Sequence, residues 1–424
     1  FAPIGLYDTM TANTTRLNNV RWIASHSAPG GATLLTERVR NPDDFRDADL
    51  SFMLFDPAAA PASDPRPALA SAYLAPGLNR LFSRSDWTPN ASWFTYGLSW
   101  NSIDHQMADG NAFAFYRDGE WLTKGRVGYA DIAEGIASSE FYNTVAIENN
   151  RPVDRDDSDW RIDLWQRGSQ WNYVNDGDPV LLASSMQPGF AYAHGDATKL
   201  HNSTSEGATD VVNAERAIVW LKPDHIIVYD RAATKSAGNR SSPIWSCIRL
   251  PNPATINGQR ATMTTASGQQ MFVSTLLPAN AVMSTANSNE QHIEDTAASN
   301  DPMKVRLRVD APGDPLTVEF LHVLQGADAG ASADSLLLVQ NDAGTLKGVV
   351  IADDAVLFVV DAAAVDGALQ YTLPANVTRQ IVTGLAKNRQ YSVQRTINGN
   401  TATITIAPGA GATSDDGGVL VIES

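Results

Sequence analysis

From about Leu78 to its end the chain is a succession of short apolar segments separated by turn signals, and this pattern limits the possible folds most. Ala112–Tyr116 alternates small with aromatic residues, Asp118-Gly119 follows as a turn, and Trp121-Leu122 begins the returning segment. A period of two followed by an Asp-Gly pair is typical of a β-hairpin. The sequence therefore predicts antiparallel strands here.

The same pattern recurs downstream. Ala217–Leu221 and Ile226–Tyr229 flank the turn at Lys222–His225, while Asn257-Gly258 and Asn398-Gly399 mark two further tight turns. Further strand-like runs are Ser335–Val339, Gly348–Ile351, Ala355–Val360 and Thr401–Ile406. So many strands, with no helical pattern between them, predict a mostly β protein built from stacked antiparallel sheets, a large β-sandwich.

Only the beginning of the chain has a convincing helical period. Thr15–Ser25 carries an apolar face, and Thr14 or Thr15 can cap its first turn. A second short helix is expected at Pro42–Leu54, and the proline-rich run Ala58–Leu69 is expected to be a linker.

These patterns divide a chain of 424 residues, which is long for one core, into three expected domains. Residues 1–77 would be helical with a linker, 78–335 a large β-sandwich, and 336–424 a small C-terminal β-domain. The chain starts at Phe1 with no basic segment leading into an apolar one, so we expect a processed or truncated start.

Charge and composition exclude several classes of protein. The net charge of −16 argues against nucleic acid as a partner, because a phosphate-binding surface must be basic. No apolar run reaches the roughly 20 residues of a membrane span. Cys247 is the only cysteine, so no internal disulfide can form, and its strand-like surroundings predict a buried structural thiol.

A resemblance to a known family is carried by the segment Trp100–Tyr129. It resembles the start of the β-domain in heparinase II/III-like polysaccharide lyases, which include related alginate lyases. The matching residues are His105, Asp109-Gly110, Phe113, Tyr116, Gly119 and Leu122. Later segments around Gly195-Asp196 and from Arg216 to Arg231 also resemble the family, in the same order along the chain.

The resemblance implies a fold and an activity. In the family, an incomplete α/α toroid precedes a β-supersandwich, and an acidic polysaccharide or oligosaccharide lies between them and is cleaved by β-elimination. The first helices here would be the end of that toroid. The rest of it, with a catalytic tyrosine and its partner, would be a separate chain or a missing domain. The resemblance also implies a periplasmic or secreted protein without a cofactor.

The family's β-domain histidine corresponds by position to His105. Its imidazole could donate to the substrate carboxylate or act as a base near neutral pH. Judged by residue type alone, a loop histidine hydrogen-bonded to Asp104 or Asp109 is the favoured interpretation, and it is the surrounding motif that favours a functional role. Gln106, beside it, could supply an amide donor or be only a polar loop residue.

Several family members hold a structural zinc ion in the β-domain, and here the corresponding positions have changed. They are Met107, Lys124 and Tyr142. A thioether, an ammonium group and a phenol do not form a zinc site, which needs imidazole, thiolate or carboxylate ligands. We therefore expect no metal there, with Met107 packed against Tyr142 and Lys124 filling the site.

Other residues around the signature could bind substrate. Arg84, Arg117 and Arg126 could bind uronate or sulfate oxygens with two hydrogen bonds each, although an ordinary surface ion pair is the favoured interpretation of each. Trp100 could stack on a sugar ring, whereas most tryptophans of a β-sandwich lie in its core. His194 and His201 could line the cleft or be solvated loop histidines.

Two other functions fit the same residues. A carbohydrate-binding or scaffolding β-protein without activity would keep the fold and account for the altered zinc positions. A glycoside hydrolase would need two carboxylates facing each other across a cleft, and Asp104 with Asp109 is the nearest pair to the signature loop. Release of an unsaturated uronate distinguishes the lyase from both, because neither binding nor hydrolysis forms a new carbon–carbon double bond.

Overall fold

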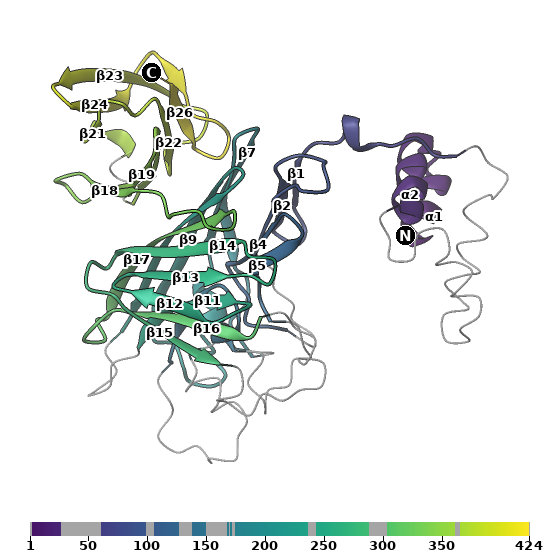
Figure 1. The fold of residues 1–424 in the computed structure, drawn as a ribbon, viewed down its shortest axis with the longest axis horizontal. Helices are drawn as coiled ribbons and strands as arrows, with labels where there is room; N and C mark the ends of the chain where they lie inside the picture. Colours follow the sequence, from purple (N-terminus) through teal and green to yellow (C-terminus); the bar gives the residue numbers. More distant parts are fainter. Residues whose placement is uncertain are drawn as a thin grey trace. The chain divides into compact units, whose positions relative to one another are not determined.

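A computed structural model gives the fold of the chain (Figure 1). It describes residues 2–26, 61–98, 106–126, 138–149, 168, 170–171, 174–235, 243–287, 303–360 and 365–423. The chain divides into two compact units, Phe1–Ala70 and Ser71–Ser424. The predicted mostly β class is confirmed.

The first unit contains two α-helices within its described residues, α1 (Ala2–Met10) and α2 (Thr14–His26). The helix predicted from the apolar period is confirmed as α2, but its predicted cap is wrong. Asn13 Oδ1 accepts a hydrogen bond of 3.0 Å from the Arg16 amide, so Asn13 caps the helix in place of Thr14 or Thr15. The helix expected at 42–54 lies outside the described residues.

No helix in the described part of the chain is long and apolar enough to cross a membrane. The second unit is built from sheets, with short 3₁₀ turns between some strands. These turns are η3 (Ser139–Phe141) and η4 (Thr198–His201), while η2 (Arg66–Ala68) belongs to the first unit.

The strands that lead to the signature segment form an antiparallel five-stranded sheet. In spatial order these are β1 (Ala72–Ala75), β2 (Arg80–Arg84), β3 (Trp93–Gly97), β4 (Ala112–Arg117) and β5 (Glu120–Thr123). The hairpin predicted around Asp118-Gly119 is confirmed as β4–β5. The sheet begins at β1, before the boundary expected at residue 78.

A larger sheet forms the centre of this unit. Its eight strands in order are β12 (Ala254–Asn257), β13 (Arg260–Thr264), β14 (Gln270–Leu277), β17 (Thr317–Ala327), β10 (His225–Thr234), β9 (Val211–Leu221), β8 (Phe190–Asp196) and β7 (Val180–Gln187). A four-stranded sheet contains β15 (Val282–Asn287), β16 (Val305–Asp310), β11 (Ile244–Leu250) and β6 (Val145–Ile147). Cys247 lies buried in β11, as predicted.

The C-terminal strands form two further sheets. The first contains β18 (Leu336–Gln340), β19 (Leu346–Ile351), β20 (Asp354–Val359), β22 (Arg379–Thr383) and β26 (Leu420–Glu423). The second contains β21 (Leu369–Pro374), β24 (Thr401–Pro408), β23 (Gln390–Asn398) and β25 (Ala412–Thr413). The turns predicted at Asn257-Gly258 and Asn398-Gly399 are confirmed, since each joins two paired strands.

The eight-stranded sheet is covered on both faces, and the sequence of its strands shows why. Along β9, Ile218 and Trp220 enter the core shared with the five-stranded and four-stranded sheets, while Val219 and Leu221 point to the opposite core. Successive side chains of a strand alternate between faces, so a continuous apolar run is required where both faces are buried.

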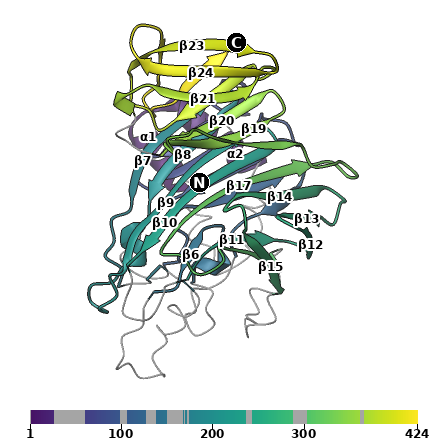
Figure 2. The same cartoon turned by 90° about the vertical axis from the view of Figure 1, so that its left-hand side faces the viewer.

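The opposite core joins the eight-stranded sheet to the first C-terminal sheet. Val356 and Phe358 of β20 enter this core, whereas Ala355 and Leu357 pack toward β21, β23 and β24. Both views show these last strands on the far side of β19 and β20 from the eight-stranded sheet (Figures 1 and 2). The second unit is therefore a stack of sheets, in which each inner sheet is apolar on both faces.

Candidate functional site

The signature segment runs into the five-stranded sheet through the loop 106–111, which leads directly into β4. His105 and Trp100, two of the predicted site residues, lie outside the described residues. The described loop that follows them, 106–111, has well-defined contacts of its own. Its last two residues, Gly110 and Asn111, are both buried and hydrogen-bonded to distant parts of the chain.

Gly110 is held by a single glutamine side chain. The Gly110 amide donates to Gln170 Oε1 at 3.0 Å, and Gln170 Nε2 donates to the Gly110 carbonyl at 3.1 Å. Thr144 Oγ1 donates to the same carbonyl at 2.9 Å. A Cβ atom at position 110 would approach Leu200 Cδ1 to 2.5 Å and the Gln170 amide to 2.9 Å. Only glycine lets the backbone come this close to the glutamine.

Asn111 joins the loop to the eight-stranded sheet. Tyr96 Oη donates to Asn111 Oδ1 at 2.6 Å, and Asn111 Nδ2 donates to the Gly195 carbonyl of β8 at 3.2 Å. Burial raises the pKa of Tyr96, which keeps its hydroxyl protonated as a donor. A Cβ atom at position 195 would lie 2.0 Å from the Tyr96 hydroxyl, so the glycine of the Gly195-Asp196 pair makes room for this contact.

A buried ion pair between Arg216 and Asp230 also holds Asn111. Arg216 of β9 donates from Nε to Asp230 Oδ1 at 2.6 Å and from Nη2 to Asp230 Oδ2 at 2.8 Å, with both side chains almost fully buried. The third nitrogen, Nη1, donates to the Asn111 carbonyl at 2.8 Å. A two-pronged carboxylate contact fixes the guanidinium plane. The loop therefore ends on a rigid polar network.

The first part of the loop packs around Phe141. Met107 lies against the small cluster of Phe141 and Tyr142, as expected from the altered zinc positions. Arg126 is buried, its amide donates to the Phe141 carbonyl at 3.0 Å, and its guanidinium carbon lies 6.0 Å from the Phe141 ring centre. Gln106 is also buried, and within the described residues its Oε1 accepts no hydrogen bond.

The expected zinc positions have a different chemistry in the structure. The Tyr142 ring covers Gly125, where a Cβ atom would come within 2.5 Å of the ring, and Lys124 Nζ donates to the Gly125 carbonyl at 3.3 Å. Among the described residues no group of His, Cys, Asp and Glu could hold a metal ion. The absence of zinc at Met107, Lys124 and Tyr142 remains a prediction.

Arg84 and Arg117 lie at the opposite end of the five-stranded sheet from this loop. In the strand register Arg84 pairs with Trp93, and Trp93 pairs with Tyr116 next to Arg117. The Arg84 guanidinium lies 4.3 Å from the Trp87 ring centre and 5.0 Å from that of Trp93. The predicted binding residues are therefore divided between the two ends of β4.

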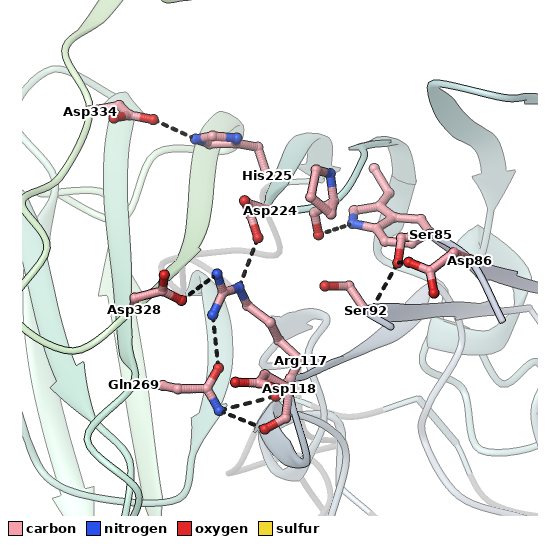
Figure 3. A network of polar contacts seen from close by, with 12 residues as sticks. Ser85, Asp86, Ser92, Arg117, Asp118, Asp224, His225, Gln269, Asp328 and Asp334 are labelled. Atoms are coloured by element: carbon pink, nitrogen blue, oxygen red, sulfur yellow. Dashed lines mark hydrogen bonds and ion pairs between the residues drawn. The ribbon is translucent and has the colours of Figure 1, made fainter. Parts of the chain in front are cut away.

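Arg117 is held by the protein itself. It donates from Nε to Asp224 and from Nη2 to Asp328, both at 2.8 Å, and from Nη1 to Gln269 Oε1 at 3.0 Å (Figure 3). Its side chain is only 14% exposed. These contacts agree with the ion-pair interpretation of Arg117 that its residue type left open.

Asp109, the described half of the proposed carboxylate pair, lies within the loop. Desolvation raises the pKa of its carboxyl group to about 6, although 29% of the side chain is exposed and Arg80 Nη2 lies 3.7 Å away. Asp104 lies outside the described residues. Of the two histidines considered, His194 bonds to Glu215 at 3.1 Å, whereas His201 is buried, and burial lowers its pKa to about 3. The interpretation of His201 as a solvated histidine is wrong.

The residues that clamp the loop 106–111 were not predicted as such, and only some of them could have been found from the sequence. They are Tyr96, Gln170, Arg216 and Asp230. Arg216 and Asp230 are directly opposed in the β9–β10 hairpin, so counting outward from its predicted turn would have paired them. Opposed charges across a hairpin are a recognised stabilising pattern. Gln170 lies 60 residues from Gly110 in a segment without strand periodicity, and nothing in its sequence context indicates the contact.

The fold is shared with solved polysaccharide lyases. Two structures of the heparan sulfate lyase from Pedobacter heparinus, one of them a mutant, have TM-scores of 0.51 and 0.52 against this chain and cover 75% and 83% of it, each at 10% identity. A heparinase III structure has a TM-score of 0.51 and covers 81% of the chain, also at 10% identity. This chain has the fold of these lyases. The resemblance seen in the signature segment is thereby confirmed at the level of the fold.

The structural similarity to these lyases extends over only part of their length. The chain covers 46% to 52% of the length of the lyase chains that it matches, so it corresponds to about half of each. No protein-family model and no curated protein matches the sequence.

Proposed function

We propose that this chain is the β-sheet portion of a polysaccharide lyase that cleaves uronate-containing acidic polysaccharides by β-elimination. The observation that carries the proposal is the clamped loop 106–111 in a fold shared with heparan sulfate lyases. Gly110 and Asn111, five and six positions after His105, are fixed by four hydrogen bonds with Gln170, Tyr96 and Arg216. Catalytic groups require such positioning, whereas a solvated surface loop does not.

In β-elimination His105 would have one of two roles. Elimination removes the proton on C5 of a uronate, a very weak carbon acid, and breaks the bond to the departing glycosidic oxygen. Hydrogen bonds that neutralise the adjacent carboxylate stabilise the negative charge that develops there. In this proposal His105 donates to that carboxylate or accepts the C5 proton, and its ordinary pKa near neutrality suits either task.

The remaining catalytic groups are proposed to come from an α/α toroid, supplied by a separate chain or by a part of the protein that this sequence does not include. The chain matches about half of each lyase, which is consistent with such a partner. The signature segment implies that the toroid contributes a tyrosine and an amide or histidine. Secretion to the periplasm or the exterior belongs to the same proposal, because polymeric acidic substrates lie outside the cell.

The test is an elimination assay with the protein that includes its toroid. Heparan sulfate and alginate are offered as substrates, and the ultraviolet absorbance of the conjugated double bond in the product is followed. A rising absorbance supports a lyase. Binding without any rise, for either substrate, would favour a non-catalytic carbohydrate-binding protein instead.

A further inference from the structure

A cavity of about 490 Å³ opens at the hairpin end of the sheets, where Arg117, Asp118 and Asp224 lie (Figure 3). Several turns meet around it, including the β4–β5 turn at Asp118, the β9–β10 turn at 222–224 and the β7–β8 turn at 188–189. The length of β4 separates it from the loop 106–111, roughly 17 Å at about 3.4 Å per residue. The cavity is thus distinct from the candidate site described above.

The wall of the cavity is rigid. Arg117 is fixed by Asp224, Asp328 and Gln269, and Gln269 Nε2 in turn donates to the Arg117 and Asp118 carbonyls at 3.1 and 3.2 Å. These bonds tie the β4–β5 turn to the eight-stranded sheet. A site formed in advance loses little conformational freedom when a ligand binds.

Charge narrows the ligand class. The cations lining the cavity are Arg117 and Lys222, and the carboxylates are Asp86, Asp118, Asp224 and Asp328, which gives a formal charge of −2. An anionic ligand would meet this excess of carboxylates. Among the described residues no cluster of acidic, His or Cys side chains is suited to a metal ion. A neutral polar ligand fits both observations.

The hydrogen-bonding groups of the cavity limit the class of ligand further. Asp118 only accepts hydrogen bonds, and its carboxylate has no partner among the described residues. Lys222 only donates, and the one hydrogen bond of its side chain within the described residues is a long one of 3.5 Å from Nζ to Ser71 Oγ. Burial lowers the pKa of Lys222, and its Nζ lies 5.4 Å from the Trp220 ring centre. A hydroxyl group both donates and accepts, so a molecule with several hydroxyls offers a partner to both kinds of group that line the cavity.

We infer that this cavity binds a neutral, hydroxyl-rich sugar residue. The inference goes beyond the proposed function, because the site would bind such a sugar whether or not the protein carries out elimination. It would give the protein a second contact with carbohydrate, separate from any uronate bound near His105.

Calorimetric titration with cellobiose, maltose and lactose, and with glucuronate for comparison, tests the inference. We expect at least one disaccharide to bind, and any binding of glucuronate at the separate uronate site to be insensitive to substitution of Asp118. Asp118→Asn should weaken the binding about tenfold, because a hydrogen bond to a carboxylate is replaced by a weaker one to a neutral amide oxygen. Asparagine tolerates the left-handed backbone at this position, where φ is +42°, so the turn is preserved.

Asp342→Asn is the matched control, since Asp342 is an exposed aspartate of the C-terminal sheets that does not line the cavity. Its affinity should equal that of the unaltered protein. The inference is overturned if none of the three disaccharides binds, or if Asp118→Asn leaves the affinity for the disaccharide unchanged. The titration measures heat of binding, so a protein without lyase activity still gives a decisive result.

Discussion

The clamp on the signature loop can be tested by removing the Gln170 side chain. Gln170→Ala deletes both bonds to Gly110, at 3.0 and 3.1 Å, and leaves the buried Gly110 amide without its acceptor. An unsatisfied buried amide costs about 1–3 kcal/mol, and the cavity left by the side chain adds to that cost. We therefore expect the free energy of unfolding to fall by about 2–4 kcal/mol.

Urea denaturation measures the stability, and hydrogen exchange of a peptide covering 106–126 reports on the loop. The Gly110 amide should exchange faster in Gln170→Ala. Misplacing His105 by about 1 Å should also slow elimination by up to about a hundredfold in the protein with its toroid.

Gln370→Ala is the matched control, because Gln370 is exposed on β21 and makes one bond of 3.3 Å to Thr405 Oγ1. It should change stability by no more than about 0.5 kcal/mol. If Gln170→Ala behaves like this control in both stability and exchange, the loop is not held by Gln170. The proposed positioning of His105 by this loop would then be refuted.

Three further perturbations test other parts of the structure. Asp230→Asn leaves the buried Arg216 charge without its partner and should cost about 3–5 kcal/mol in urea denaturation, whereas Asp366→Asn in an exposed pair should cost at most about 1 kcal/mol; equal costs would refute the buried pair. Burial raises the pKa of the Cys247 thiol to about 12, so a thiol reagent should react with it only after unfolding, and rapid reaction with the folded protein would contradict its burial. Because the pKa of Asp109 is about 6 in the folded state and near 3.8 when unfolded, the folded state binds more protons between these values. Its contribution to stability should therefore decrease as the pH rises from about 4 to about 6, and Asp109→Asn should remove that dependence in denaturation measured across this range.

Local features of the sequence predicted local features of the fold. The hairpins around Asp118-Gly119 and Lys222–His225 were predictable because strand alternation and turn residues lie within a dozen positions of one another. The continuous apolar run of Ala217–Leu221 also carried the information that both faces of β9 are buried. The helix α1 (Ala2–Met10) was missed because its apolar residues do not form a clear stripe.

The candidate site was less predictable, since its contacts join distant segments. Gln170 and Gly110 are far apart in sequence, and no periodicity reveals their contact. The sequence could nevertheless have predicted that Gln106 and Arg117 lie at different ends of the sheet. Gln106 precedes β4 and Arg117 is its last residue, and an extended strand cannot bring its own ends together.

The proposed lyase activity depends on His105, and one pair of measurements tests it most directly. His105→Ala and the unaltered protein, each with the toroid, are compared for their rate of double-bond formation on an acidic polysaccharide and for their melting temperature. The account predicts a rate at least about a hundredfold lower and an almost unchanged melting temperature, since one acid–base or charge-stabilising group is lost without loss of packing. An unchanged rate per folded molecule, together with a lower melting temperature, would contradict it and make His105 a structural residue.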